Sequence, residues 1–254
     1  MAMIGVFDSG VGGLSVLRAI AHALPHEPLH YVADSAHAPY GERDAAFIEA
    51  RALAIAGRLV DQGAKLLVVA CNTASVVAVA RLRERFAALP IVAMEPALKP
   101  AAAITRTGTV GVLATARTLA SAAVQRLQQA HPQVRWRLQP CPGWVDAVER
   151  GDTDSAATRT FVHRHVRPLV DAGADTLVLG CTHYPFLAPL IVQAAGPGVT
   201  LVDPAPAVAR QVAARLPRPA AAAPAHRFST TGDTAHASAL VSRLWGTPVT
   251  VHPA

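Results

Sequence analysis

The sequence predicts an α/β protein made of two pseudo-symmetric domains, each a doubly wound parallel sheet, that face each other across a central cleft. Three observations lead to this fold class. Short apolar runs alternate with helical patterns along the chain, a segment that ends in cysteine occurs twice, and the strand pattern restarts after residue 95. Such alternation favours parallel strands joined by right-handed crossovers.

The repeated segment is DQGAKLLVVACNT at 61–73 and DAGADTLVLGCTH at 171–183. The shared residues keep one offset, so Cys71 and Cys181 lie 110 residues apart. Each segment is a short apolar run that follows a Gly-Ala turn and ends in a cysteine with small polar residues after it. This pattern predicts a buried parallel strand that delivers a thiol at its C-terminal end, where open α/β sheets bind ligands.

The first half reads as four strand–helix units. We expect strands at 3–7, 28–33, 65–70 and 90–94, and helices at 14–23, 45–62 and 72–87. Gly63 follows the second helix at the position that a C-terminal cap prefers. The loop at 8–13 is polar and rich in glycine, but its spacing is not that of a dinucleotide fingerprint.

The pattern breaks at 95–100 and then restarts. We expect strands at 109–114, 134–138 and 199–203, a helix at 156–172, and the second cysteine strand within 171–183 directly after that helix. A helix at 207–216, a loop at 217–224, a strand from 228, a helix at 234–244 and a strand at 249–252 exceed the repeat and should pack on one half. The predicted domains are therefore 1–95 with 207–254, and 96–206.

Composition limits the class of protein. The chain has 254 residues, of which 52% are hydrophobic, and this is enough for two cores without a metal or a disulfide. Three distant cysteines fit a reducing compartment, and neither an export signal nor a membrane span is recognisable, so we expect a cytoplasmic protein. The net charge of +6 is scattered rather than gathered in a basic tract, which makes nucleic acid an unlikely partner.

Several residues are candidates for chemistry. Cys71 and Cys181 both stand where a strand is expected to lead into a helix, and a helix N-terminus favours the thiolate. Both cysteines could instead be small buried hydrophobic residues. His183 could relay protons or, with the cysteines, bind zinc, although the usual zinc-ligand spacings are absent.

Three carboxylates, Asp8, Asp34 and Glu149, follow strands or lie in loops on the same edge. They could tune a thiol, orient an ammonium group or cap a helix. Cys141, between two prolines, is interpreted as structural.

A pair of thiols can do what one cannot. Two acid/base groups on opposite faces of a carbon can remove a proton from one face and return it on the other, which inverts a stereocentre. The only lysines, Lys65 and Lys99, have no phosphate-loop context, so nothing indicates Schiff-base chemistry.

Seven short motifs, in order along nearly the whole chain, resemble those of the glutamate racemase family. They are Asp8-Ser9-Gly10-x-Gly12-Gly13, Pro39-Tyr40-Gly41, Cys71-Asn72-Thr73-Ala74-Ser75, Gly111-x-x-Ala114-Thr115, Glu149-x-Gly151, Gly180-Cys181-Thr182-His183-Tyr184-Pro185 and Thr230-Thr231-Gly232-Asp233. The resemblance implies a two-base racemase without cofactor or metal that interconverts L- and D-glutamate and supplies D-glutamate for bacterial peptidoglycan. The similar aspartate racemases usually have an acidic residue where this chain has His183, which favours glutamate.

The resemblance also implies roles for residues. Cys71, helped by Asp8, would take the α-proton from D-glutamate, and Cys181, helped by His183, would take it from L-glutamate. The residues implied to bind the substrate are Ser9, Tyr40, Gly41, Asn72, Thr73, Thr115 and Thr182, with Asp34 and Glu149 as supporting carboxylates. A homodimer is implied as well, and the N-terminal extension that some relatives use for activation is expected to be missing.

Two other classes stay open at this point. A Cys/His acyl-transfer hydrolase would use Cys181 and His183 and be indifferent to Cys71. A two-lobed amino-acid binding protein would hold its ligand without chemistry.

Overall fold

The computed structural model describes residues 2–217 and 225–254. It divides into two compact units, the described residues of Met1–Met94 with Ala205–Ala254, and Glu95–Pro204. Each unit is treated below by itself. The loop expected at 217–224 lies, from residue 218 on, outside the described residues.

The first unit is built on a six-stranded sheet in the order β10-β9-β2-β1-β3-β4, and every neighbouring pair is parallel. Its strands are β1 (Met3–Asp8), β2 (Leu29–Ala33), β3 (Ala64–Val69), β4 (Ile91–Ala93), β9 (Arg227–Thr230) and β10 (Val251–Pro253). Its helices are α1 (Leu14–Ala23), α2 (Ala45–Asp61), α3 (Asn72–Arg85), α10 (Ala205–Arg215) and α11 (Thr234–Trp245), with short 3₁₀ turns η1 (Ser35–His37) and η2 (Tyr40–Glu42).

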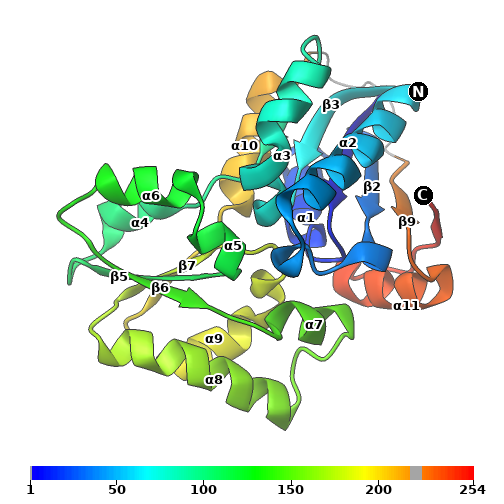
Figure 1. Ribbon diagram of the computed structural model, residues 1–254. Helices are drawn as coiled ribbons and strands as arrows, with labels where there is room; N and C mark the ends of the chain where they lie inside the picture. Colours follow the sequence, from blue (N-terminus) through cyan, green and yellow to red (C-terminus); the bar gives the residue numbers. More distant parts are fainter. Residues whose placement is uncertain (1, 218–224) are drawn as a thin grey trace. The chain divides into compact units, whose positions relative to one another are not determined.

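The second unit carries a four-stranded parallel sheet in the order β6-β5-β7-β8. Figure 1 shows α4 and α6 on one side of this sheet and α8 and α9 on the other. The strands are β5 (Thr109–Ala114), β6 (Arg135–Pro140), β7 (Thr176–Leu179) and β8 (Thr200–Val202). The helices are α4 (Leu98–Ile104), α5 (Ala116–Leu119), α6 (Ala122–Gln129), α7 (Trp144–Glu149), α8 (Ala156–Asp171) and α9 (Ala188–Ala195), with η3 (Tyr184–Leu187) before α9.

Local sequence explains where the elements begin and end. Asp44 caps α2 by accepting a hydrogen bond from the Phe47 N–H at 2.7 Å, and Gly63 follows this helix with φ of 93°. β1 and β3 are almost wholly buried, as expected for central strands with helices on both faces. The carboxyl ends of the strands therefore form one edge in each unit, and the cysteines stand there.

The fold confirms the predicted α/β class and the parallel strands. It also confirms the helices expected before residue 90, at 156–172 and after 207, and the pairing of the C-terminal strands with the first sheet.

One local expectation was wrong. Cys181 does not lead directly into an α-helix, because a turn and η3 come before α9, which begins at Ala188 with Pro189 in its first turn. The sequence did not predict α4, which begins within the break at 95–100.

Candidate active site

The first thiol lies at the junction of β3 and α3. Cys71 is the N-cap of α3, and its Sγ accepts a hydrogen bond from the backbone N–H of Ala74 at 3.4 Å. Its side chain is buried, and Sγ lies 3.6 Å from Oγ of Ser9. The helix N-terminus offers N–H groups and the positive end of its dipole, so this position stabilises a thiolate.

Asp8 stands beside Ser9 at the end of β1. Its carboxylate is fully buried and accepts hydrogen bonds from the Gly13 N–H at 2.6 Å and from the Ser9 hydroxyl at 3.4 Å. A Cβ at Gly13 would lie 2.7 Å from the Asp8 Cβ, so the loop needs glycine there to approach the carboxylate. Asp8, Ser9 and Cys71, which were selected from the sequence, therefore form one connected group.

Asn72 and Thr73 open α3 and are both buried. Within the described part of the chain, neither Oδ1 nor Nδ2 of Asn72 has a hydrogen-bond partner. A buried amide without partners is costly, and proteins rarely keep one without a reason. A polar ligand beside Cys71 would satisfy it.

Asp34 stands at the N-cap position of η1, but its side chain makes no capping hydrogen bond there. Its buried carboxylate accepts hydrogen bonds from the hydroxyls of Tyr40, at 2.6 Å, and Thr231, at 2.8 Å, and pairs with Arg51. Burial would raise the pKa of Asp34, but the hydrogen bonds from Arg51, Tyr40 and Thr231 outweigh it and hold this pKa below its usual value. Gly41 follows Tyr40 in η2. Sequence reasoning missed Arg51, because nothing near it in the chain marks it.

The second thiol has different surroundings. Cys181 Sγ lies 3.7 Å from Nδ1 of His183, and the other ring nitrogen, Nε2, lies 2.6 Å from Oε1 of Glu149. Glu149 ends α7, and His183 is almost completely inaccessible to solvent. The structure therefore joins Cys181, His183 and Glu149 in one chain of contacts.

The charge on His183 follows from these two partners. Burial by itself would lower the pKa of His183, but the hydrogen bonds and negative charges of Cys181 and Glu149 outweigh it and hold this pKa well above the usual value. A protonated ring has two N–H donors, which suits a carboxylate on one side and a sulfur acceptor on the other.

The remaining residues of the second unit differ in their surroundings. Thr115 follows β5 and caps α5, accepting from the Thr118 N–H at 3.3 Å. Thr182 is buried next to Cys181. Cys141 donates its thiol hydrogen to the Gln139 carbonyl at 3.4 Å, and burial raises its pKa well above the usual value, as a structural cysteine requires.

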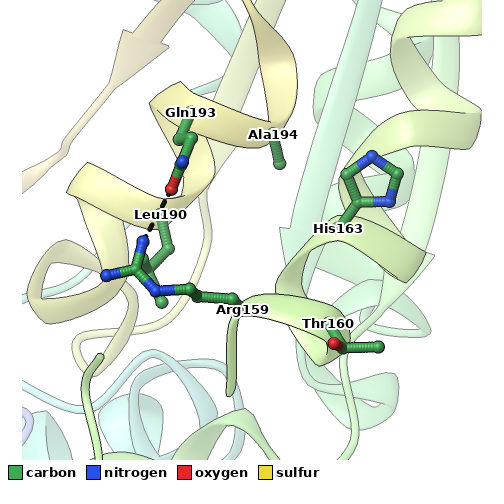
Figure 2. A pocket seen from close by; sticks show the side chains of 6 residues that line it. All are labelled: Arg159, Thr160, His163, Leu190, Gln193 and Ala194. Atoms are coloured by element: carbon green, nitrogen blue, oxygen red, sulfur yellow. Dashed lines mark hydrogen bonds between the residues drawn. The ribbon is translucent and has the colours of Figure 1, made fainter. Parts of the chain in front are cut away.

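A cavity of about 460 Å³ is lined by residues of α8 and α9 (Figure 2). Arg159 reaches across it to Oε1 of Gln193 at 2.8 Å, and its guanidinium also pairs with Asp154. Arg159 therefore already has an acidic partner at the surface.

Comparisons with known proteins all identify racemases. Residues 4–212 match the family model described as Asp/Glu/Hydantoin racemase. A glutamate racemase of Ectopseudomonas mendocina is 50% identical over 99% of this chain and 97% of its own length.

Solved structures give the same result. The glutamate racemase isoform RacE1 of Bacillus anthracis matches with a TM-score of 0.91 and 32% identity, over 100% of this chain and 97% of its own. Escherichia coli glutamate racemase in complex with L-glutamate and the activator UDP-MurNAc-ala matches with a TM-score of 0.89 and 33% identity, over 100% and 99%.

Proposed function

The chain belongs to the Asp/Glu/hydantoin racemase family, and we propose that it is a glutamate racemase in which Cys71 and Cys181 exchange the α-proton of one substrate molecule. The observation that carries this proposal is the duplicated strand end. Each unit brings a buried thiol to the carboxyl edge of its sheet, and each thiol has its own acid/base neighbours.

The proposed reaction balances with these groups alone. The Cys71 thiolate takes the α-proton of D-glutamate, and the electron pair left on the α-carbon is delocalised into the α-carboxylate. The Cys181 thiol then gives its proton to the opposite face, leaving L-glutamate, a Cys71 thiol and a Cys181 thiolate. The reverse sequence converts L-glutamate into D-glutamate.

In this proposal the two thiolates are stabilised by different groups. The N-terminal N–H groups of α3 stabilise the Cys71 thiolate, while Asp8 and Ser9 form a polar wall beside it. Protonated His183 stabilises the Cys181 thiolate and is itself held by Glu149.

Substrate binding is proposed for the polar groups at the same edges. Ser9, Tyr40, Gly41, Asn72 and Thr73 would hold the substrate from the first unit, and Thr115 and Thr182 from the second. The unpaired amide of Asn72 supports this assignment, because a carboxylate and an ammonium group can satisfy both of its ends. Tyr40 differs from the others, because its hydroxyl already donates a hydrogen bond to Asp34. Its side chain therefore holds the turn in place.

The biological setting follows from the reaction. D-glutamate is a building block of peptidoglycan, and we propose that the enzyme supplies it. We place the enzyme in the cytoplasm, because free cysteines stay reduced there. No helix in the described residues is long and apolar enough to cross a membrane. A homodimer is proposed from the family resemblance, and light scattering on the purified protein tests it.

The test is racemisation in deuterated water without added cofactor. Wild type should interconvert L- and D-glutamate, which circular dichroism measures. It should also introduce deuterium at the α-carbon, which NMR measures. Cys71→Ser and Cys181→Ser should each lose inversion by about 10²- to 10⁴-fold, since a serine hydroxyl is a much weaker acid than a thiol. A wild type active only on aspartate would contradict the substrate, and a Cys71→Ser variant that keeps full racemisation would contradict the two-thiol mechanism. A wild type that does not racemise glutamate but carries out acyl transfer, with no loss in Cys71→Ser, would favour acyl-transfer chemistry at Cys181.

A further inference from the structure

We propose that Arg51 is a positioning residue for the Cys71 half of the site, acting through Asp34. This inference rests on the proposed racemase function. Arg51 comes from α2 and grips the carboxylate with both arms of its guanidinium, Nε to Oδ2 at 2.9 Å and Nη2 to Oδ1 at 2.7 Å. The Arg51 side chain is 20% exposed and the Asp34 side chain 0%, so the pair is shielded from water.

The carboxylate of Asp34 joins three segments that come from distant parts of the sequence. Tyr40 of η2 donates to Oδ2, and Thr231, directly after β9, donates to Oδ1. The backbone N–H of Asp34 also donates to the carbonyl of Asp8 at 2.9 Å. The buried charge of Asp34 thus joins the turn with Tyr40 and Gly41 to the end of β9, and the backbone N–H of the same residue joins them to the end of β1.

The junction works only while Asp34 is ionised. A carboxylate can only accept hydrogen bonds, so the Tyr40 and Thr231 hydroxyls must donate to it and their orientations are fixed. A protonated carboxyl group would place a donor against them. Because burial disfavours the charged form, a fixed cation has to stabilise it, and Arg51 is that cation.

Other titratable groups near the junction have lesser parts. His37 places Nδ1 3.0 Å from Oδ1 of Asp34, but its side chain is 32% exposed and it makes one contact rather than two. Burial and the charge of Asp34 raise the pKa of Tyr40, with the nearby Cys71 adding to this, so the phenol keeps its proton.

Loss of Arg51 should therefore loosen the turn with Tyr40 and Gly41 and the end of β9, without removing any group that reacts. Displacement of a positioned group by about 1 Å can cost about 10²-fold in rate. We expect Arg51→Met to lower kcat/KM by about 10- to 100-fold. The two enantiomers of glutamate have equal free energy, so this factor must be the same in both directions and only its division between kcat and KM can differ.

The pH profile separates this role from a merely structural one. Arg51 lowers the pKa of Asp34, so in Arg51→Met the carboxylate should become protonated at higher pH. The acid-side loss of kcat/KM should then move to higher pH than in wild type. Arg51→Lys keeps the charge but not the two-armed geometry, and it should recover part of kcat/KM and most of the wild-type profile.

The experiment compares wild type, Arg51→Met, Arg51→Lys and Arg58→Met on L- and D-glutamate between pH 5 and 9. Arg58 is an exposed arginine on the same helix, and its replacement should leave kcat/KM and the profile unchanged. Thermal unfolding by circular dichroism establishes that each variant is folded.

Each outcome decides between the two hypotheses. If wild type racemises glutamate and folded Arg51→Met matches it at every pH, the positioning role is refuted while the racemase function stands. If wild type does not racemise glutamate, the proposed function itself fails. Should Arg51→Met not fold, Arg51→Lys decides: wild-type kcat/KM with it would overturn the need for a two-armed contact.

Discussion

The two units reach their thiols by the same backbone route but surround them differently. In the first, the N–H of Ala70 donates to the Phe7 carbonyl at 2.8 Å; in the second, the N–H of Gly180 donates to the Leu113 carbonyl at 2.7 Å. The next residue in each case is the cysteine. The strand orders β2-β1-β3-β4 and β6-β5-β7-β8 also correspond one to one.

The side chains beside the thiols do not correspond. Asp8 ends β1, whereas Ala114 ends β5 at the matching place, and His183 of the second unit matches Thr73 of the first. Sγ of Cys71 therefore accepts a helix N–H near the Asp8 carboxylate, whereas Sγ of Cys181 lies against the ring of His183. The repeated fold places two thiols, and the individual side chains give each of them its own electrostatic surroundings.

The largest expected effect tests whether each thiol serves one enantiomer. A glutamate analogue with chloride on its β-carbon loses chloride once the α-proton is removed, because the electron pair forms a double bond to that carbon. Cys71→Ser should lose chloride release from the D form by about 10²- to 10⁴-fold and retain it from the L form, and Cys181→Ser should show the reverse. Chloride is measured with an ion-selective electrode.

Equal losses of chloride release from the D and L forms in both variants would contradict this prediction, because neither thiol would then serve a single enantiomer. Cys141→Ser is the matched control. Its thiol is buried and bonded to a backbone carbonyl, so release from both forms should stay close to wild type.

A second prediction concerns the charge that distinguishes the Cys181 half. Glu149→Gln keeps a hydrogen-bond acceptor for His183 but removes the negative charge that helps to hold the pKa of His183 above its usual value. His183 should then lose its proton at a lower pH. The decline of kcat/KM at high pH should therefore begin about one to three pH units lower than in wild type.

NMR of the histidine ring measures that pKa directly. A profile that does not move would mean that Glu149 orients the ring without setting its charge. Asp146→Asn, on the same helix and without a resolved contact to His183, serves as the control and should leave the profile unchanged.

Much of this arrangement was predictable from the sequence. The apolar runs located the strands, and the repeat located Cys71 and Cys181 at equivalent strand ends, because both patterns act over short stretches of chain. Helices such as α5 and α6 escaped prediction, since four and eight residues give too few turns for a periodic pattern.

The connections among site residues were less predictable. Arg51 lies 17 residues beyond Asp34, and Glu149 lies 34 residues before His183, so only the tertiary fold brings them together. The sequence marked Asp34 as a carboxylate at a strand end but could not distinguish a cap from an ion pair. The assignment of substrate-binding residues stays a prediction.

A third prediction uses the residues that precede the two cysteines. A Cβ on Gly180 would lie 2.8 Å from the Ala114 Cβ and 2.9 Å from the Leu113 carbonyl oxygen, so Gly180→Ala should cost about 1–3 kcal/mol of unfolding free energy. The first unit accommodates Ala70 at the matching place. Ala70→Gly should cost only about 1 kcal/mol, from one lost methyl group and added chain entropy.

Urea unfolding monitored by circular dichroism gives both values. If Gly180→Ala cost no more than Ala70→Gly, the strand ends would be interchangeable in packing, and the difference between the halves would lie in their charges alone.

The smallest effect concerns Ser9 and Thr115, the residues that directly follow β1 and β5. Thr115 caps α5, whereas the contacts of the Ser9 hydroxyl within residues 2–217 and 225–254 are longer, at 3.4 Å to Asp8 and 3.6 Å to Cys71. Thr115→Ala should therefore lower the unfolding free energy by about 1 kcal/mol, and Thr115→Ser should restore it, since serine caps helices equally well. Ser9→Ala should leave stability close to wild type and lower kcat/KM instead. Equal losses of stability at both positions would show that the two hydroxyls stabilise the fold in the same way. The two units would then differ only in the side chains that contact Cys71 and Cys181.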